Sequence, residues 1–111
     1  MMQGMGFYMA QRLSALVMAP LVLGHIAVMI YAIQGGLSTA EILERTRDSL
    51  AWFAFYGSFV IAVSIHAAVG LRVIVTETLK LRGVLLDLFT WGVMIVLLVM
   101  GARAVSAVTM L

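Results

Sequence analysis

Three long, predominantly apolar stretches dominate this sequence, at residues 13–33, 50–75 and 84–108. The hydrocarbon core of a bilayer is about 30 Å thick, and an α-helix needs roughly 20 apolar residues to cross it. A chain of 111 residues that is 64 % apolar and 11 % charged could not present a mostly polar surface to water. We therefore predict a single all-α integral membrane domain over residues 1–111, with three transmembrane helices running up, down and up.

The links between these stretches carry signals that end one helix and begin the next. Gly35 and Gly36 predict the end of the first helix, and Ser38 or Thr39 is suited to cap a short surface helix. The second link, "TETLKLRG", is basic and contains Gly83, which predicts a break before the third span. With three spans, the two ends of the domain lie on opposite sides of the membrane.

Basic residues near the span ends indicate the orientation, because they are enriched on the cytoplasmic side. One side carries three arginines mixed with three acidic residues, and the other carries four basic residues: Arg12, Arg72, Lys80 and Arg82. We expect the N-terminus to lie in the cytoplasm and the chain to reside in a bacterial inner membrane.

Charge and cysteine content exclude several functions. The net charge is +2 and the basic residues do not cluster, so no nucleic-acid partner is expected. The sequence contains no cysteine, which rules out thiolate-held iron–sulfur clusters within this chain. Any metal or cofactor must therefore be bound through histidine or carboxylate side chains.

Two histidines, His25 and His66, fall inside the apolar stretches. An ionisable side chain at membrane depth costs roughly 2.5–3.5 kcal/mol on insertion, so it faces protein, cofactor or water. Counted along antiparallel helices, both imidazoles are expected near mid-membrane. Each has two favourable environments: a hydrogen bond to another helix, or an axial bond to haem iron.

The residues around His66 favour an axial bond to haem iron over a hydrogen bond to another helix. Gly70 lies one turn further on the same helix face, where a missing side chain gives a flat macrocycle room. Arg72 lies about 9 Å closer to the membrane surface, a suitable depth for meeting a haem propionate. The alternative is that Gly70 only permits close helix packing and that Arg72 extends to the lipid headgroups.

Three polar residues lie on or beside the first span. His25 follows Pro20 by five residues and is suited to a packing hydrogen bond, to ligation of the same haem, or to ligation of another one. Arg12 and Ser14 mark the inner end of this span, where a cation and a hydroxyl are suited to contact a quinone carbonyl or a propionate. Interfacial anchoring is the alternative for both.

The motifs "QRLSAL" and "HAAVGLRVIVTE", followed by a short basic turn and a third span, resemble the cytochrome b membrane-anchor subunits of succinate dehydrogenase, respiratory complex II. The resemblance covers essentially the whole chain in length and span order. It implies packing with a second anchor subunit, haem b between the two, and a quinone site near the iron–sulfur subunit. "QRLSAL" favours the smaller (D-type) anchor, and "GLR" is more typical of the larger (C-type) one.

Carried over residue by residue, the resemblance implies that His66 is the axial haem ligand, and hence the metal ligand, with Gly70 as the glycine of the H-x-x-x-G motif. The arginine after that glycine falls on Arg72, and the arginine and hydroxyl residue at the start of the first helix fall on Arg12 and Ser14. In the remainder of the motif, Glu77 replaces the usual aspartate. Thr78 replaces a tyrosine of the smaller anchor, a departure that weakens any quinone contact from this link. A counterpart of His25 occurs in some relatives with two haems.

The resemblance also implies a role in electron transfer. Succinate would be oxidised in a flavoprotein subunit, and electrons would pass through the iron–sulfur subunit to ubiquinone or menaquinone. The chain itself would be non-catalytic and would supply haem ligation, a docking surface and part of the quinone site. The alternatives are an anchor of fumarate reductase or of another quinone-linked dehydrogenase, and a non-redox three-helix membrane scaffold.

Overall fold

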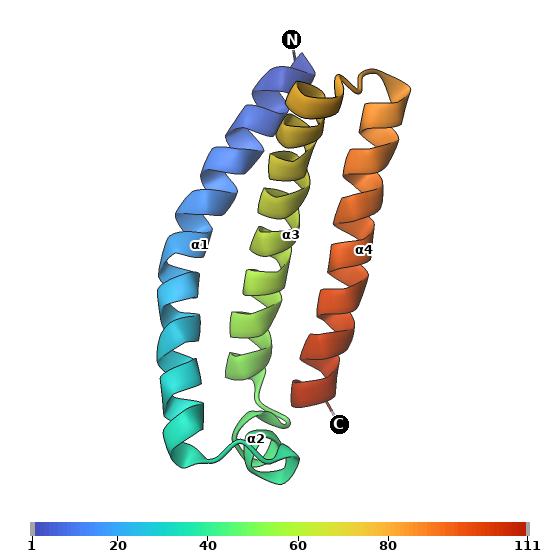
Figure 1. Ribbon diagram of the computed structural model, residues 1–111. Helices are drawn as coiled ribbons and strands as arrows, with labels where there is room; N and C mark the ends of the chain where they lie inside the picture. Colours follow the sequence, from blue (N-terminus) through green and yellow to red (C-terminus); the bar gives the residue numbers. More distant parts are fainter. Residues whose placement is uncertain (1, 111) are drawn as a thin grey trace.

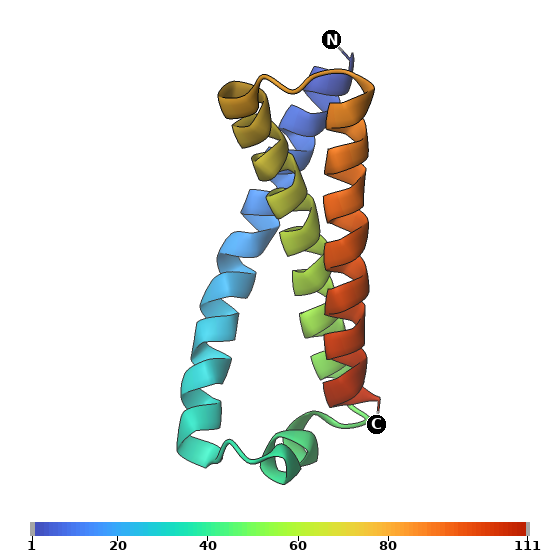
Figure 2. The same cartoon turned by 45° about the vertical axis from the view of Figure 1, so that its right-hand side comes forward.

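The computed structural model describes residues 2–110, which form four α-helices and no strand. These are α1 (Met2–Gly35), α2 (Thr39–Thr46), α3 (Leu50–Leu79) and α4 (Val84–Thr109). The three long helices are apolar and long enough to cross a membrane, which confirms the predicted all-α class. They lie side by side, with the start of α1 and the α3–α4 link at one end of the bundle and α2 at the other (Figures 1 and 2).

Two helices extend beyond the predicted spans. The helix α1 has 34 residues, which corresponds to about 51 Å of rise, and begins 11 positions before the apolar stretch at residue 13. The helix α3 continues four residues past the predicted limit at residue 75. The predicted spans end where the apolar residues end. The observed helices continue until residues with non-helical backbone angles stop them. Lys80, with φ of 59°, and Gly83, with φ of 70°, interrupt the helical backbone between α3 and α4.

The helix α3 is central, since α1 and α4 both pack chiefly against it. Small side chains make these contacts close, as expected for helices that associate within a membrane. A Cβ atom added at Gly101 of α4 would overlap Val60 of α3. One added at Gly24 of α1 would lie 3.2 Å from the ring of Phe55. Most of the fully buried side chains are small or hydroxylated, among them Ala62, Ser64, Ala68 and Thr90.

The helix α1 curves and diverges from the other two toward its C-terminal end, as Figure 2 shows. Pro20 lies in its interior and has no backbone N–H, so the carbonyl of Leu16 loses its helical partner. The helix nevertheless continues through this point to Gly35. The divergence widens the space between α1 and α4 on the side where α2 lies.

The short helix α2 closes this wider end. Ser38, one of the two caps that the sequence predicted, is its N-cap, and it also forms a reciprocal capping box with Glu41. Gly36, with φ of 113°, makes the preceding turn. The hydroxyl of Thr46 donates to the carbonyl of Val108, and the backbone N–H of Asp48 donates to the carbonyl of Thr109 at 2.7 Å. The link after α1 therefore caps the C-terminal end of α4.

The outer faces of the bundle are strongly apolar. Large exposed side chains occur on all three long helices, for example Leu16, Leu23, Ile61, Leu88 and Met100. A surface of this kind is suited to lipid or to another membrane helix rather than to water. Each of the three long helices thus exposes apolar side chains along its length.

Candidate functional site

His66 lies near the middle of α3 and faces α1. Its Nδ1 atom is 3.4 Å from the hydroxyl oxygen of Ser14, which is only 6 % exposed. The Ser14 hydroxyl also donates to the carbonyl of Gln11, one turn earlier in α1, at 3.0 Å. The one hydrogen bond to the His66 ring within residues 2–110 is this contact at Nδ1, and the other ring nitrogen, Nε2, takes part in none there. This imidazole is therefore held at one nitrogen only.

The space beside Gly70 faces the same helix. A Cβ atom at Gly70 would lie 3.5 Å from Nε2 of Gln11, so the amide of Gln11 covers this position. The Oε1 atom of Gln11 is buried and has no partner among the described residues. Sequence reasoning missed Gln11, because an uncharged amide in "QRLSAL" carries no charge signal. The one feature of the sequence that could have indicated a role for Gln11 is its position directly before Arg12, which makes two consecutive polar residues.

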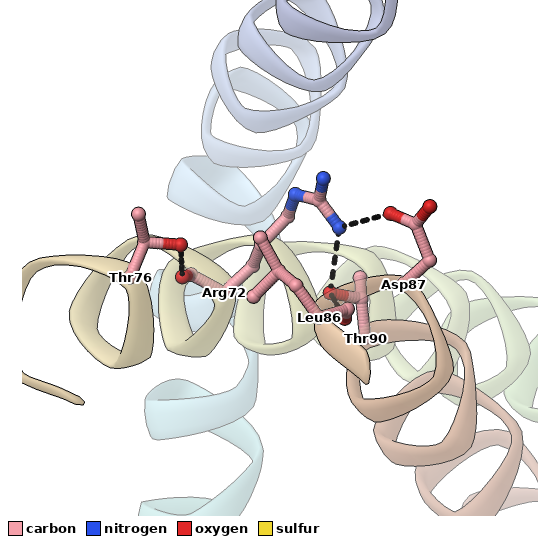
Figure 3. Close-up of polar contacts among 5 residues, drawn as sticks. All are labelled: Arg72, Thr76, Leu86, Asp87 and Thr90. Atoms are coloured by element: carbon pink, nitrogen blue, oxygen red, sulfur yellow. Dashed lines mark hydrogen bonds and ion pairs between the residues drawn. The ribbon is translucent and has the colours of Figure 1, made fainter. Parts of the chain in front are cut away.

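The side chain of Arg72 on α3 forms an ion pair and a hydrogen bond with residues of α4. Its Nη1 atom donates to Oδ1 of Asp87 at 2.9 Å and to the hydroxyl of Thr90 at 3.1 Å (Figure 3). Its guanidinium also lies 4.2 Å from the ring centre of Phe7 on α1. Asp87 lies in the first turn of α4, where a carboxylate also complements the helix dipole. Arg72 therefore joins all three long helices.

Arg12, in contrast, is exposed and forms no ion pair with any residue between 2 and 110. Its guanidinium lies 5.7 Å from the ring centre of Tyr8, one turn earlier in α1. Of the two arginines predicted to meet a cofactor, Arg12 is the one whose charge is not already balanced within the described chain.

A pocket of about 330 Å³ lies between the N-terminal half of α1 and the C-terminal half of α3. It is lined by side chains of both helices, of which four are polar or charged: Gln11, Arg72, Thr76 and Glu77. Ser14 does not line it. Thr78 is exposed and donates its hydroxyl to the carbonyl of Ile74. Polar groups from two helices thus converge near the basic end of the bundle.

His25 lies at a different level from His66. Its ring packs edge-on against Phe59, with ring centres 5.1 Å apart, and against Tyr56 at 6.4 Å. Since Phe59 precedes His66 by seven positions on α3, the two imidazoles differ by about 10 Å along the helix. His66 is near mid-helix as expected, and His25 lies closer to α2. Two ligands at such different levels cannot bind opposite faces of one iron atom.

His25 also borders an interhelical pocket. This pocket, about 620 Å³, lies where α1 diverges, and it is lined by residues of all four helices, including Ile42, Val60 and Val105. The Nδ1 atom of His25 is buried and has no partner among the described residues. The predicted interhelical hydrogen bond is therefore not formed within residues 2–110.

Metal ligation within this chain would depend on single side chains. Within residues 2–110, no group of three or more histidine, aspartate or glutamate side chains could hold a metal ion. The sequence contains no cysteine. A planar cofactor that takes one axial imidazole from this chain is compatible with the donors present, and the unpartnered Nε2 of His66 is suited to that role.

These features define the class of the chain: it is a small, three-helix integral membrane protein with polar groups in its interior. The chain matches the family described as succinate dehydrogenase/fumarate reductase transmembrane subunit over residues 2–102. It therefore belongs to that family. Neither a curated protein nor a solved structure matches the chain.

Proposed function

We propose that this chain is the haem b-binding membrane anchor of a succinate:quinone oxidoreductase, of the smaller type. The observation that carries the proposal is the position of His66, which lies near the middle of a membrane helix with Nε2 unpartnered among the described residues. A mid-membrane imidazole in this environment needs a partner, and haem iron is a suitable one. Family membership supports the same role.

The second axial ligand would come from a second anchor subunit. His25 lies about 10 Å from His66 along the helix axis, so it does not supply the opposite ligand. The exposed apolar faces of the long helices offer surface for such a partner within the bilayer. Bound haem would supply a one-electron carrier at this position. Arg12, exposed and unpaired within residues 2–110, is suited to hold a propionate.

A quinone head group, of ubiquinone or menaquinone, would bind near the pocket of about 330 Å³. Gln11 is suited to hydrogen-bond the quinone there, since its Oε1 is buried without a partner among the described residues. Arg72 would supply positive charge partly balanced by Asp87. Ser14 is buried and lies within hydrogen-bond distance of Gln11 on α1 and His66 on α3, so we assign it to His66 and not to the quinone.

The same end of the bundle would bind the iron–sulfur subunit and, through it, the flavoprotein subunit. Glu77, Lys80 and Arg82 are exposed there, on and after the C-terminal end of α3. Charged side chains at a membrane surface are suited to contact a soluble subunit. With the iron–sulfur subunit on the cytoplasmic side of a bacterial inner membrane, the N-terminus would be cytoplasmic too.

A second candidate is the anchor of a fumarate reductase, because the family includes both kinds of transmembrane subunit. Another quinone-linked dehydrogenase is a third. The anchor would bind the same groups in each of them, and the soluble subunits would determine the reaction. Succinate-dependent quinone reduction by the purified complex, compared with quinol-dependent fumarate reduction, separates these candidates.

The test of haem binding compares two histidine variants in the assembled complex. His66→Ala should abolish the reduced-minus-oxidised absorption band of haem b, whereas His25→Ala should retain it. An unchanged band in His66→Ala would overturn haem ligation by this residue and leave a three-helix anchor. Copurification of the soluble subunits with His66→Ala shows whether the complex still assembles.

A further inference from the structure

We infer that Ser14 is a positioning residue that fixes the tautomer of His66 and so leaves Nε2 as the ligating nitrogen. The inference rests on the proposed function and deepens it. It starts from the hydrogen bonds around one hydroxyl group, which the sequence had associated with quinone or a propionate.

The hydroxyl of Ser14 has one hydrogen to donate. The carbonyl oxygen of Gln11, 3.0 Å away, can only accept, so this hydrogen is directed to it. Toward His66 Nδ1, at 3.4 Å, the same oxygen then has only lone pairs to offer. The contact is satisfied when Nδ1 carries the imidazole proton and donates it to Ser14.

A neutral imidazole carries one proton, so protonation of Nδ1 leaves a lone pair on Nε2. The lone pair is what an iron atom binds. Ligating histidines generally donate their other N–H to an oxygen, which fixes the ring and makes the ligand more basic. Ser14 supplies that oxygen from a different helix, so the packing of α1 on α3 sets the chemistry of His66.

Burial strengthens this effect. Ser14 is 6 % exposed, so water does not readily replace it as the acceptor for Nδ1–H. No other hydrogen bond to the His66 ring occurs within the described residues. Ser64, also buried and only two positions from His66 on α3, makes no hydrogen bond to the ring and provides a matched control.

The test uses Ser14→Ala and Ser64→Ala in the assembled complex. Ser14→Ala should weaken haem affinity by about 10- to 100-fold, the range seen when such outer oxygens are removed. Its haem midpoint potential should become more positive, because a less basic imidazole stabilises ferric iron less. Ser64→Ala should leave both quantities unchanged. Equal potentials and haem affinities in Ser14→Ala and the unmodified complex would overturn the inference.

A second measurement does not depend on haem. In the complex prepared from haem-deficient cells, nitrogen-15 NMR of labelled histidine reports which ring nitrogen is protonated. His66 should be the Nδ1–H tautomer, and Ser14→Ala should shift it toward Nε2–H. A ring already protonated at Nε2 would overturn the inference. Haem loss in His66→Ala without any effect of Ser14→Ala would refute the role of Ser14 alone, whereas retention of haem in His66→Ala would refute the proposed function.

Discussion

Arg72 on α3 and Asp87 on α4 form an ion pair of 2.9 Å across the tight link between their helices. Thr90 and the ring of Phe7 complete the surroundings of the guanidinium. Arg72 is 15 % exposed and Asp87 is 37 % exposed, so solvent screens the pair only on one side. The pair lies where two membrane helices meet and fixes their relative register.

Removing either charge should destabilise the bundle. Asp87→Leu leaves the Arg72 guanidinium without its carboxylate and should cost about 1–2 kcal/mol, a loss typical of hydrogen bonds to charged groups. Arg72→Leu should have a similar effect. The double variant should lose less than the sum, by at least about 0.5 kcal/mol, because neither charge is then unpaired. Thermal unfolding of the purified complex measures all four forms, and strictly additive losses would contradict the coupling.

Gly101 should not tolerate a side chain. A methyl group there overlaps Val60, so Gly101→Ala should separate α3 and α4 and cost about 1–3 kcal/mol. Gly92→Ala on the same helix is the matched control, because nothing lies within 4 Å of the added carbon. Combining Gly101→Ala with Val60→Ala should restore part of the loss. Melting temperatures of the complex distinguish these variants, and equal values for the two alanine variants would disprove the close contact.

His25→Phe should stabilise the chain by about 1 kcal/mol. The buried Nδ1 of His25 has no partner within residues 2–110, and such an atom carries a desolvation penalty that phenylalanine avoids. The new ring would keep its edge-on contacts with Phe59 and Tyr56. Thermal unfolding and the haem spectrum are measured together. A loss of haem absorbance in His25→Phe would instead identify His25 as a ligand.

Acidification should loosen α2. The hydroxyl of Ser38, at 2.6 Å, and then its backbone N–H lower the pKa of Glu41 below its ordinary value of about 4.5. A group whose pKa is lower in the folded state contributes its stability above the unfolded value, and loses it as the pH falls through the folded pKa. The protection of residues 39–46 against hydrogen exchange, corrected for the intrinsic exchange rate at each pH, should therefore fall only below about pH 4.5.

Ser38→Ala is the control for this pH effect. It removes a serine cap, which is worth about 1 kcal/mol to a helix, so exchange in α2 should already be faster at neutral pH. The additional acid-dependent increase should shrink, because Glu41 loses its strongest hydrogen bond. An identical pH profile in both proteins would show that Ser38 does not hold the carboxylate.

Much of the fold could be predicted because it follows from local signals. Apolar length identified the three membrane helices, and the small residues before α2 identified its start. The family followed from two short motifs and was confirmed over residues 2–102. The true ends of α1 and α3 were not predicted, since a helix continues beyond the membrane wherever nothing in the backbone interrupts it.

The internal contacts of the site could not be predicted, because they depend on how antiparallel helices are aligned. Which residue of α1 meets His66 depends on small side chains such as Gly24, whose contacts have no periodic signal in the sequence. For that reason the contact between Ser14 and His66 was not predicted, Gln11 was overlooked, and His25 was expected at the same membrane depth as His66. The pairing of Arg72 with Asp87 also requires the relative rotation of α3 and α4.

The capping of α4 by the link after α1 has a consequence for biogenesis. Thr46 and Asp48 leave the ribosome long before Val108 and Thr109, whose carbonyls they cap. These bonds can form only after the last span has been translated. Until then, the donors of Thr46 and Asp48 lack these two carbonyl partners. Closure of the bundle at this end is therefore a post-insertion event.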